Sequence, residues 1–318
     1  MALFDALYPA LDWPAVRAQW PHSGHSVFVR TPGMRWHVQR MGDGPVALLL
    51  HGTGASTHSW RDVMPLLAQR FSVVAIDLPG HGFSSPMEPG PPSLPRVASA
   101  VLALMAQLQL SPVLWVGHSA GAAIAAQCCI DTLSQSPQAA ADLRVVGCNP
   151  AWLPLTGPSQ WLFPMAAWLI GHNPLAGWLA ARRAAQTGAV ERLLASTGSA
   201  LDAAGLEGYR YLLSQPAHVR GVLDLMAAWN LNRFAQHLSA LRCPVLMQIG
   251  EADRTVPPQQ AIDALAWLPH AHIQRWASLG HLAHEQAPQA SVQALLAWLD
   301  STKGAVETHI GGVEGAGD

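Results

Sequence analysis

Residues 113–121 read VLWVGHSAG, a short apolar run that ends in a G-x-S-x-G motif around Ser119. An Ala-rich stretch with a helical pattern follows at once, so the motif lies between a predicted strand and a predicted helix. In this context a sharp elbow lifts the serine hydroxyl clear of the sheet, and small flanking residues let the strand and the helix approach closely. The stretch therefore predicts a nucleophilic serine on an α/β sheet. A glycine-rich turn with an incidental serine is the alternative.

Further short apolar runs occur on both sides of this motif. Runs of this kind suit strands that are covered on both faces of a sheet, and they span residues 46–50, 72–76, 143–146, 245–249 and 273–276. Helical patterns separate them, at residues 59–69, 95–109, 121–135, 259–267 and 287–300. A hairpin is expected at residues 26–40, with its turn at Pro32 and Gly33. The alternation predicts an α/β fold with a mostly parallel, doubly wound sheet.

One segment interrupts this alternation. Residues 150–237 contain no clear strand and read as several helices separated by Pro and Gly, so we interpret them as a helical cap inserted over the sheet. The core then comprises residues 1–149 and 238–301. The last segment, residues 302–318, is rich in Gly and small residues and is expected to be disordered.

Two polar residues that follow later strands complete a catalytic pattern. Asp253 comes after the strand at residues 245–249, and His281 comes after the last strand. The chain order Ser, Asp, His is the one expected when a G-x-S-x-G serine uses a histidine base that a carboxylate orients. We therefore interpret Ser119, Asp253 and His281 as a catalytic triad, with Glu251 as the alternative acid.

The loop after the strand at residues 46–50 reads HGTG and is expected to lie beside the elbow. The backbone N–H groups of Thr53 and Ala120 would then form an oxyanion hole. Each preformed donor of this kind typically contributes about 10²–10³-fold in rate. His51 itself is expected to be a structural loop residue, and a plain turn between a strand and a helix is the alternative for the whole loop.

Five motifs together resemble the α/β-hydrolase superfamily: HGTGASTHSW, DLPGHGFS, GHSAG, GEADRTVP and LGHLAHE. They extend over nearly all of residues 35–300, and the resemblance implies the α/β-hydrolase fold and the triad. Within the superfamily, the chain resembles the branch of α/β-hydrolase-like magnesium-chelatase accessory proteins of bacteriochlorophyll biosynthesis. The segments HGTGASTHSWRD, NPAWLPL and residues 196–231 carry that second resemblance. It implies a link to magnesium tetrapyrroles but supplies no reaction.

Composition excludes several classes of function. The net charge is −2 and only 12% of the residues are charged, so no basic stripe is available for nucleic acid. No apolar run reaches the roughly 18 residues of a membrane span, although peripheral membrane contact stays open. The four cysteines read as reduced thiols of a cytoplasmic protein. No cofactor or metal site is expected, because residues 281–285 match neither zinc motif and residues 52–54 are not a dinucleotide fingerprint.

The first half of the cap carries no charge. Between Arg144 and Arg182 there is no Asp, Glu or Lys and no other Arg. Its tryptophans either pack the cap on the core or line an apolar substrate pocket above Ser119 that suits a flat ligand such as a tetrapyrrole, or a lipid interface. They are Trp152, Trp161, Trp168 and Trp178. In the tetrapyrrole interpretation, His172 and His218 are candidate axial ligands of a chelated magnesium.

Two functions from different classes follow. The first is a serine hydrolase that cleaves an ester or acyl bond of a hydrophobic substrate through an acyl-enzyme. The second is a non-catalytic accessory protein that binds porphyrin and contacts magnesium chelatase. A cofactor-free haloperoxidase-like side activity is a third, weaker hypothesis. The intact triad favours the first, whereas the resemblance to chelatase accessory proteins leaves room for the second.

Overall fold

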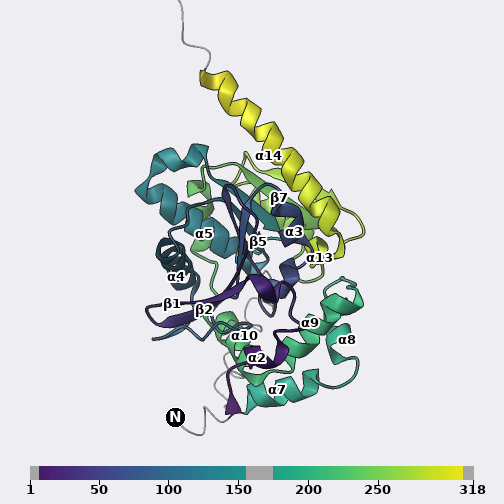
Figure 1. The fold of residues 1–318 in the computed structure, drawn as a ribbon. Helices are drawn as coiled ribbons and strands as arrows, with labels where there is room; N and C mark the ends of the chain where they lie inside the picture. The colour runs from purple at the N-terminus through teal and green to yellow at the C-terminus, as the bar shows by residue number, and fades with distance from the viewer. Residues whose placement is uncertain (1–6, 155–174, 311–318) are drawn as a thin grey trace, which may run out of the picture.

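An eight-stranded sheet forms the centre of the computed structural model, which describes residues 7–154 and 175–310 (Figure 1). The strand order is β1-β2-β4-β3-β5-β6-β7-β8. β1 pairs with β2, and β2 with β4, in antiparallel fashion, and every other neighbouring pair is parallel. The strands are β1 (Ser26–Thr31), β2 (Met34–Met41), β3 (Val46–Leu50), β4 (Ser72–Ile76), β5 (Pro112–His118), β6 (Arg144–Cys148), β7 (Val245–Gly250) and β8 (His272–Trp276). The predicted hairpin and all the predicted strands are confirmed.

Helices cover both faces of this sheet. They are α3 (Val63–Leu67), α4 (Leu94–Gln107), α5 (Ala120–Gln135), α12 (Pro258–Ala264), α13 (Ala283–Gln286) and α14 (Pro288–Ile310). Alternate residues of β3 show the two layers: Leu48 and Leu50 pack in the cluster that contains α4 and α5, whereas Ala47 and Leu49 pack against α3 and α14. This is why the strand sequences are continuously apolar rather than alternating.

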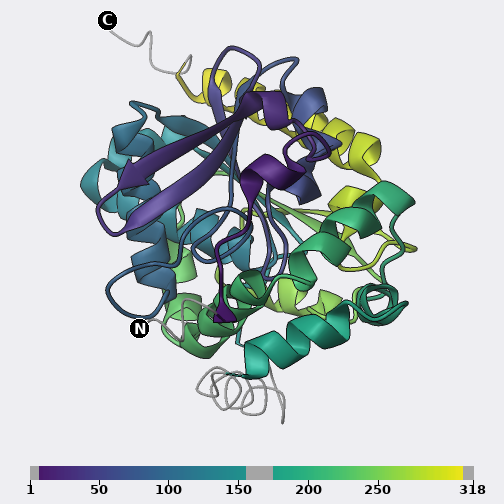
Figure 2. The same cartoon turned by 60° about the horizontal axis from the view of Figure 1, so that its bottom comes forward.

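The inserted cap lies beyond the carboxyl edge of the sheet (Figure 2). Its described helices are α7 (Ala176–Ala184), α8 (Ala189–Ser196), α9 (Ala203–Leu213), α10 (Pro216–Ala228) and α11 (Phe234–His237). The described part of residues 150–237 contains no strand, as expected. The short helix α2 (Trp13–Val16) packs with α9 around Phe83 and Leu212. Single 3₁₀ turns complete the fold at η1 (Ser23–His25), η2 (Thr57–Trp60), η3 (Pro137–Ala141) and η4 (Leu238–Ala240).

The C-terminal segment differs from the prediction. Helix α14 continues to Ile310, so the first part of the segment expected to be disordered is helical. The hydroxyls of Ser301 and Thr302 donate to the carbonyls of Trp298 and Leu299, one turn back. The prediction relied on composition. One glycine, here Gly304, destabilises a helix by only about 1 kcal/mol relative to alanine, and the long helix that precedes it can continue through it. Residues 311–318 lie outside the described residues.

Candidate active site

β5 and α5 meet at a sharp elbow that carries Ser119. Its backbone has φ 51° and ψ −116°, a left-handed conformation that costs a non-glycine residue roughly 1–3 kcal/mol. A Cβ atom on Gly117 would lie 2.3 Å from the carbonyl oxygen of Gly121, and one on Gly121 would lie 2.1 Å from that of Leu50. The G-x-S-x-G spacing therefore has a steric basis here, because backbones occupy the space of both missing side chains.

The HGTG loop lies against this elbow. A Cβ atom on Gly52 would lie 2.6 Å from Nδ1 of His118 and 3.2 Å from Cβ of Ser119, so glycine allows the approach. Within the described residues, the backbone N–H groups of Thr53 and Ala120 donate no hydrogen bond to another protein group. Free N–H groups near the serine are what an oxyanion hole requires. The role of Thr53 and Ala120 stays a prediction with this geometry in its favour.

Asp253 accepts four hydrogen bonds at the end of β7. Its Oδ1 atom accepts from the backbone N–H groups of Thr255 and Val256, at 2.7 and 2.9 Å. Its Oδ2 atom accepts from Nδ1 of His281 at 2.7 Å and from Nδ2 of Asn149 at 2.8 Å. The carboxylate is buried, so these donors replace the water it has lost and fix its orientation. The structure thus brings the predicted acid and base together.

Ser119 and His281, the predicted nucleophile and base, belong to different loops that His118 connects. Among the described contacts, no hydrogen bond joins the Ser119 hydroxyl to His281. His118, which precedes the nucleophile, connects the two regions: its Nε2–H donates to the carbonyl of His281 at 2.9 Å. Burial holds the pKa of His118 well below 6.5, so the ring is neutral and can donate through this nitrogen. In apo enzymes the serine–histidine contact often tightens only with substrate.

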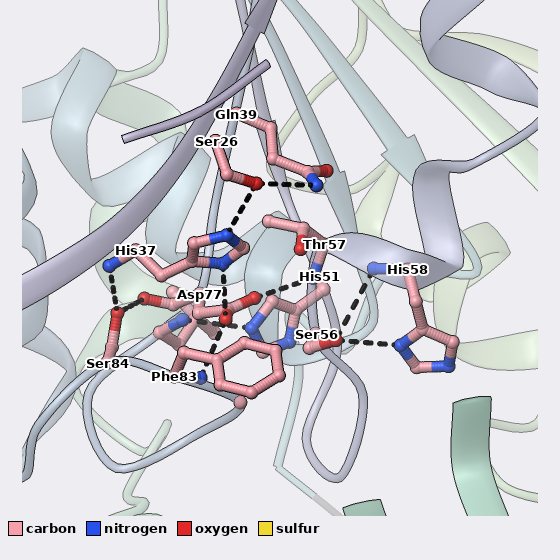
Figure 3. Close-up of polar contacts among 12 residues, drawn as sticks. Ser26, His37, Gln39, His51, Ser56, Thr57, His58, Asp77, Phe83 and Ser84 are labelled. Carbon is pink, nitrogen blue, oxygen red and sulfur yellow. Dashed lines mark hydrogen bonds and ion pairs between the residues drawn. The ribbon is translucent and has the colours of Figure 1, made fainter. Parts of the chain in front are cut away.

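Asp77, a buried carboxylate, holds the segment that follows the HGTG loop in place (Figure 3). Asp77 accepts from the Thr57 N–H at 2.7 Å, from Nδ1 of His37 at 2.8 Å and from the Phe83 N–H at 2.9 Å. Burial alone would raise the pKa of Asp77, but His37 and the other donors keep it well below its usual range. Gly82 is required beside it, because a Cβ there would lie 2.2 Å from Oδ2.

His51 is structural, in agreement with the sequence-based expectation. Its Nδ1–H donates to the carbonyl of Gly52 at 2.8 Å, and its Nε2 accepts the N–H of Leu78 at 2.9 Å. Burial lowers its pKa, which keeps the ring in this neutral form. Both nitrogens are occupied, so His51 cannot act as a base.

These motifs in this arrangement match a known family. The sequence profile of the alpha/beta hydrolase family matches residues 47–294. The chain belongs to the α/β-hydrolase family. Ser119 directly follows β5, and the predicted acid Asp253 and base His281 lie in the loops after β7 and β8, as expected for that fold.

Relatives place the chain more closely within the α/β-hydrolase family. The magnesium-chelatase 30 kDa subunit of Rhodobacter capsulatus is 37% identical over 91% of this chain and 100% of the relative. A hydrolase of Bacillus subtilis, named as uncharacterized, is 25% identical over 76% of this chain and 84% of the relative. The crystal structure of an α/β-hydrolase fold protein from Burkholderia ambifaria superposes with a TM-score of 0.69 at 22% identity. It covers 91% of this chain and 99% of that one.

The cap of this α/β hydrolase is joined to the core by a buried ion-pair cluster. Arg61 contacts Glu285 at 3.3 Å and Asp202, at the start of α9, at 2.9 Å. The hydroxyl of Tyr209 on α9 donates to Glu285 at 2.7 Å. Burial raises the pKa of Glu285 to about 7, even though Tyr209 and Arg61 favour its ionised form. A carboxyl group whose pKa lies near neutral pH is therefore located where the cap meets the core.

His218 has a structural role, and the hypothesis that it ligates magnesium is wrong. It lies on α10 and is fully buried. Its Nδ1 accepts the N–H of Gly82 at 3.0 Å, and its Nε2–H donates to the carbonyl of Gly54 at 3.2 Å. Neither nitrogen can reach a ligand, because both tie the cap to core loops. His172, the other candidate, lies outside the described residues.

The four cap tryptophans do not share one environment. Trp152 is 1% exposed and packs in the core cluster with α4 and α5, so it supports the packing interpretation and not a pocket. Trp178 on α7 is half-buried, with the guanidinium of Arg182 4.7 Å from its ring centre. Trp161 and Trp168 lie outside the described residues. A pocket lined by Trp161, Trp168 and Trp178 stays a prediction.

A cavity of about 510 Å³ lies between α10 and the loop at residues 79–92, and the triad residues do not line it. No group of three or more His, Cys, Asp or Glu within residues 7–154 and 175–310 is arranged to hold a metal ion. In that same part of the chain, no helix combines the length and apolar character needed to cross a bilayer.

Sequence reasoning missed two residues that contact the triad, Asn149 and His118. Asn149 directly follows β6, so its place at the carboxyl edge of the sheet was a usable signal, since polar residues at that edge gather around the site. Its backbone has φ 44°, which asparagine tolerates better than most residues. His118 carried no signal of its own, because a residue inside the G-x-S-x-G motif can be of almost any type.

Asn149 is expected to position Asp253. We predict that Asn149→Gly, which removes the amide without straining the left-handed backbone, lowers kcat/KM for an activated ester about 10-fold, because a hydrogen bond to a charged group contributes about 1.5–3 kcal/mol. The acidic limb of the pH profile should shift as well, since Asp253 would keep only three donors. Asn149→Asp should be worse than glycine. An unchanged pH profile in the glycine variant would contradict a positioning role.

Glu285 gives a pH dependence with a defined sign. Its pKa is raised in the folded state, so the folded chain binds the proton more tightly than the unfolded chain, and stability falls as pH rises from about 4.5 to about 7. The parent protein loses this stability as the pH rises, whereas a glutamine does not titrate. We therefore predict that the free energy of unfolding of Glu285→Gln, compared with that of the parent protein, increases by about 2 kcal/mol when the pH is raised from 5 to 8. Urea unfolding at both pH values measures this. The exposed Glu207→Gln is the control and should show no such gain.

Proposed function

We propose that this chain is a serine hydrolase that cleaves an ester or acyl bond through an acyl-enzyme. The observation that carries the proposal is the strained Ser119 elbow beside the bonded His281–Asp253 pair. Backbone strain of this kind persists only where the surroundings enforce it, and it clusters at active sites. A purely structural serine would have no need of the left-handed conformation.

Each residue then has a defined chemical step. The Ser119 hydroxyl oxygen attacks the carbonyl carbon while Nε2 of His281 accepts the hydroxyl proton. The N–H groups of Thr53 and Ala120 stabilise the oxyanion, and Asp253 stabilises the imidazolium. His281 then gives its proton to the leaving alkoxide, which departs as an alcohol. Water, deprotonated by His281, attacks the acyl-enzyme and releases the acid together with free Ser119.

The substrate is proposed to be hydrophobic and connected with magnesium tetrapyrroles. The similarity to the magnesium-chelatase 30 kDa subunit supports this connection. The uncharged sequence between Arg144 and Arg182 supports the apolar character, because a cap over an ionic substrate needs charged partners for it. A contact with magnesium chelatase is part of the same proposal. The four cysteines are free and buried, which suits a reducing cytoplasmic compartment.

A non-catalytic porphyrin-binding role would leave the geometry at Ser119 without a purpose. The free N–H groups, the four donors on Asp253 and the strained serine all serve acyl transfer, and none of them serves simple binding. If Ser119 proves to be unreactive, the non-catalytic accessory role would replace the proposed hydrolase function.

The nucleophile can be tested directly. We predict that a fluorophosphonate probe labels Ser119 and that Ser119→Ala abolishes labelling. The same variant should lose at least about 10³-fold in hydrolysis of short activated esters, because triad members act as a unit. Ser136→Ala, a serine at the other end of α5, is the control and should label normally. Equal ester turnover by Ser119→Ala would refute the serine mechanism.

The substrate class needs a separate test. We predict saturable quenching of tryptophan fluorescence when protoporphyrin IX or its magnesium complex is titrated, weakened in Trp161→Ala, Trp168→Ala or Trp178→Ala. Apolar burial contributes about 25 cal/mol per Å², so several stacked rings give measurable affinity. Trp267→Ala, an exposed tryptophan after α12, is the control. Ester hydrolysis without porphyrin binding up to the solubility limit would instead indicate a generic small-ester hydrolase.

A further inference from the structure

The turn that ends cap helix α8 lies between the two loops that carry the acid and the base. The carbonyl of Thr197 accepts the N–H of Arg254 at 3.2 Å and the N–H of His281 at 3.3 Å. The hydroxyl of Ser199 accepts the N–H of Leu282 at 2.9 Å. One cap turn therefore receives the amides of the base, of the residue that follows it and of the residue that follows the catalytic acid.

The fit of this turn is set by backbone contact. Gly198 has φ 80°, and a Cβ there would lie 1.9 Å from the carbonyl oxygen of Ala252. On the other side, a Cβ on Gly280 would lie 2.2 Å from the carbonyl oxygen of Gly198. No side chain separates the cap from these loops, so a displacement of the turn is transmitted directly to the backbone of residues 252 and 280.

The His281 backbone is consequently held from two directions. His118, on the nucleophile elbow, donates to its carbonyl, and Thr197, on the cap, accepts from its N–H. The ring is held separately, by Asp253 at Nδ1. Beside these contacts and the packing of its ring on that of His118, the cap contact at its N–H is a further restraint on where Nε2 of His281 points relative to Ser119.

We propose that Thr197–Ser199 is a positioning element for the acid–base pair, through which the placement of the cap controls the activity of the triad. This inference rests on the proposed serine-hydrolase function. The cap then does more than cover the substrate. If the cap moves away from the position seen here, the N–H of His281 loses its acceptor, and the ring is held less firmly in the orientation that proton transfer needs. Misplacement of a catalytic group by about 1 Å can cost roughly 10²-fold in rate.

The test compares two glycines with similar backbones. Gly198→Ala adds a methyl group against the Ala252 carbonyl. Gly188→Ala places the same strain at φ 75°, but its Cβ would meet only the flexible end of Arg192, 2.9 Å away. Ser199→Ala removes the acceptor for Leu282, and Ser199→Thr restores a hydroxyl. Ser196→Ala is the control for the serine, because its exposed hydroxyl bonds only within α8, to the carbonyl of Leu193.

The expected result is a loss in kcat with little change in KM. Ser199→Ala should lower kcat and the rate of fluorophosphonate labelling about 10-fold, as expected for one lost hydrogen bond, and Ser199→Thr should recover most of it. Gly198→Ala should lose about 10²-fold or more, whereas Gly188→Ala and Ser196→Ala should stay within about twofold of the parent protein. Equal losses in Gly198→Ala and Gly188→Ala, or a lowered unfolding temperature at unchanged kcat, would overturn the proposal.

A spectroscopic readout keeps this proposal separate from the proposed function. The proton between His281 and Asp253 should give a low-field NMR signal, which is read without any turnover. We expect Gly198→Ala to shift or broaden this signal and Gly188→Ala to leave it unchanged. If the parent protein neither labels nor hydrolyses, the proposed function fails, and the NMR comparison still decides whether the cap turn positions His281. An identical signal in both variants would refute the positioning role.

Discussion

The close approach of β5 and α5 at the elbow is the constraint on which the site depends. Gly117 and Gly121 let the two backbones touch, and that contact forces the left-handed conformation of Ser119. The HGTG loop also lies against the elbow, since a Cβ on Gly52 would lie 2.6 Å from Nδ1 of His118 and 3.2 Å from Cβ of Ser119. A single larger residue at either elbow glycine would displace the nucleophile and the loop together, so the core sets the geometry before any catalytic side chain is placed.

Buried polar groups extend this geometry outward from the elbow. Asp77 fixes the segment that follows the HGTG loop at Thr57, and His218 ties α10 to Gly54 of that loop and to Gly82. Burial lowers the pKa of His218 to about 4 and that of His58 to about 3. At physiological pH these imidazole rings are therefore uncharged. Several histidines, such as His51, His118 and His218, have structural roles, which is why the number of histidines alone indicated neither a metal site nor a catalytic base.

The strands and the elbow could be predicted from the sequence, because each depends on local pattern and chain order. Asp253 and His281, the predicted acid and base, lie in the loops that follow β7 and β8, and parallel strands deliver such loops to one edge. What could not be predicted depends on contacts between distant segments. Trp152 reads as a cap residue but is buried in the core, and Thr197 carries no motif at all. The extension of α14 was missed because composition describes average tendency and not the helix that precedes it.

The three buried carboxylates show how this fold assigns different roles to one chemical group. Asp253 accepts from four donors and Asp77 from three, and the donors around Asp77 keep its pKa well below its usual range. Glu285 is just as buried but has only Tyr209 and Arg61, and Arg61 is shared with Asp202. Burial therefore outweighs these two partners and raises its pKa to about 7. A group that ionises near neutral pH thus lies at the junction between α9 and the core. A proton taken up or lost there changes the charge that Arg61 and Tyr209 face at this contact.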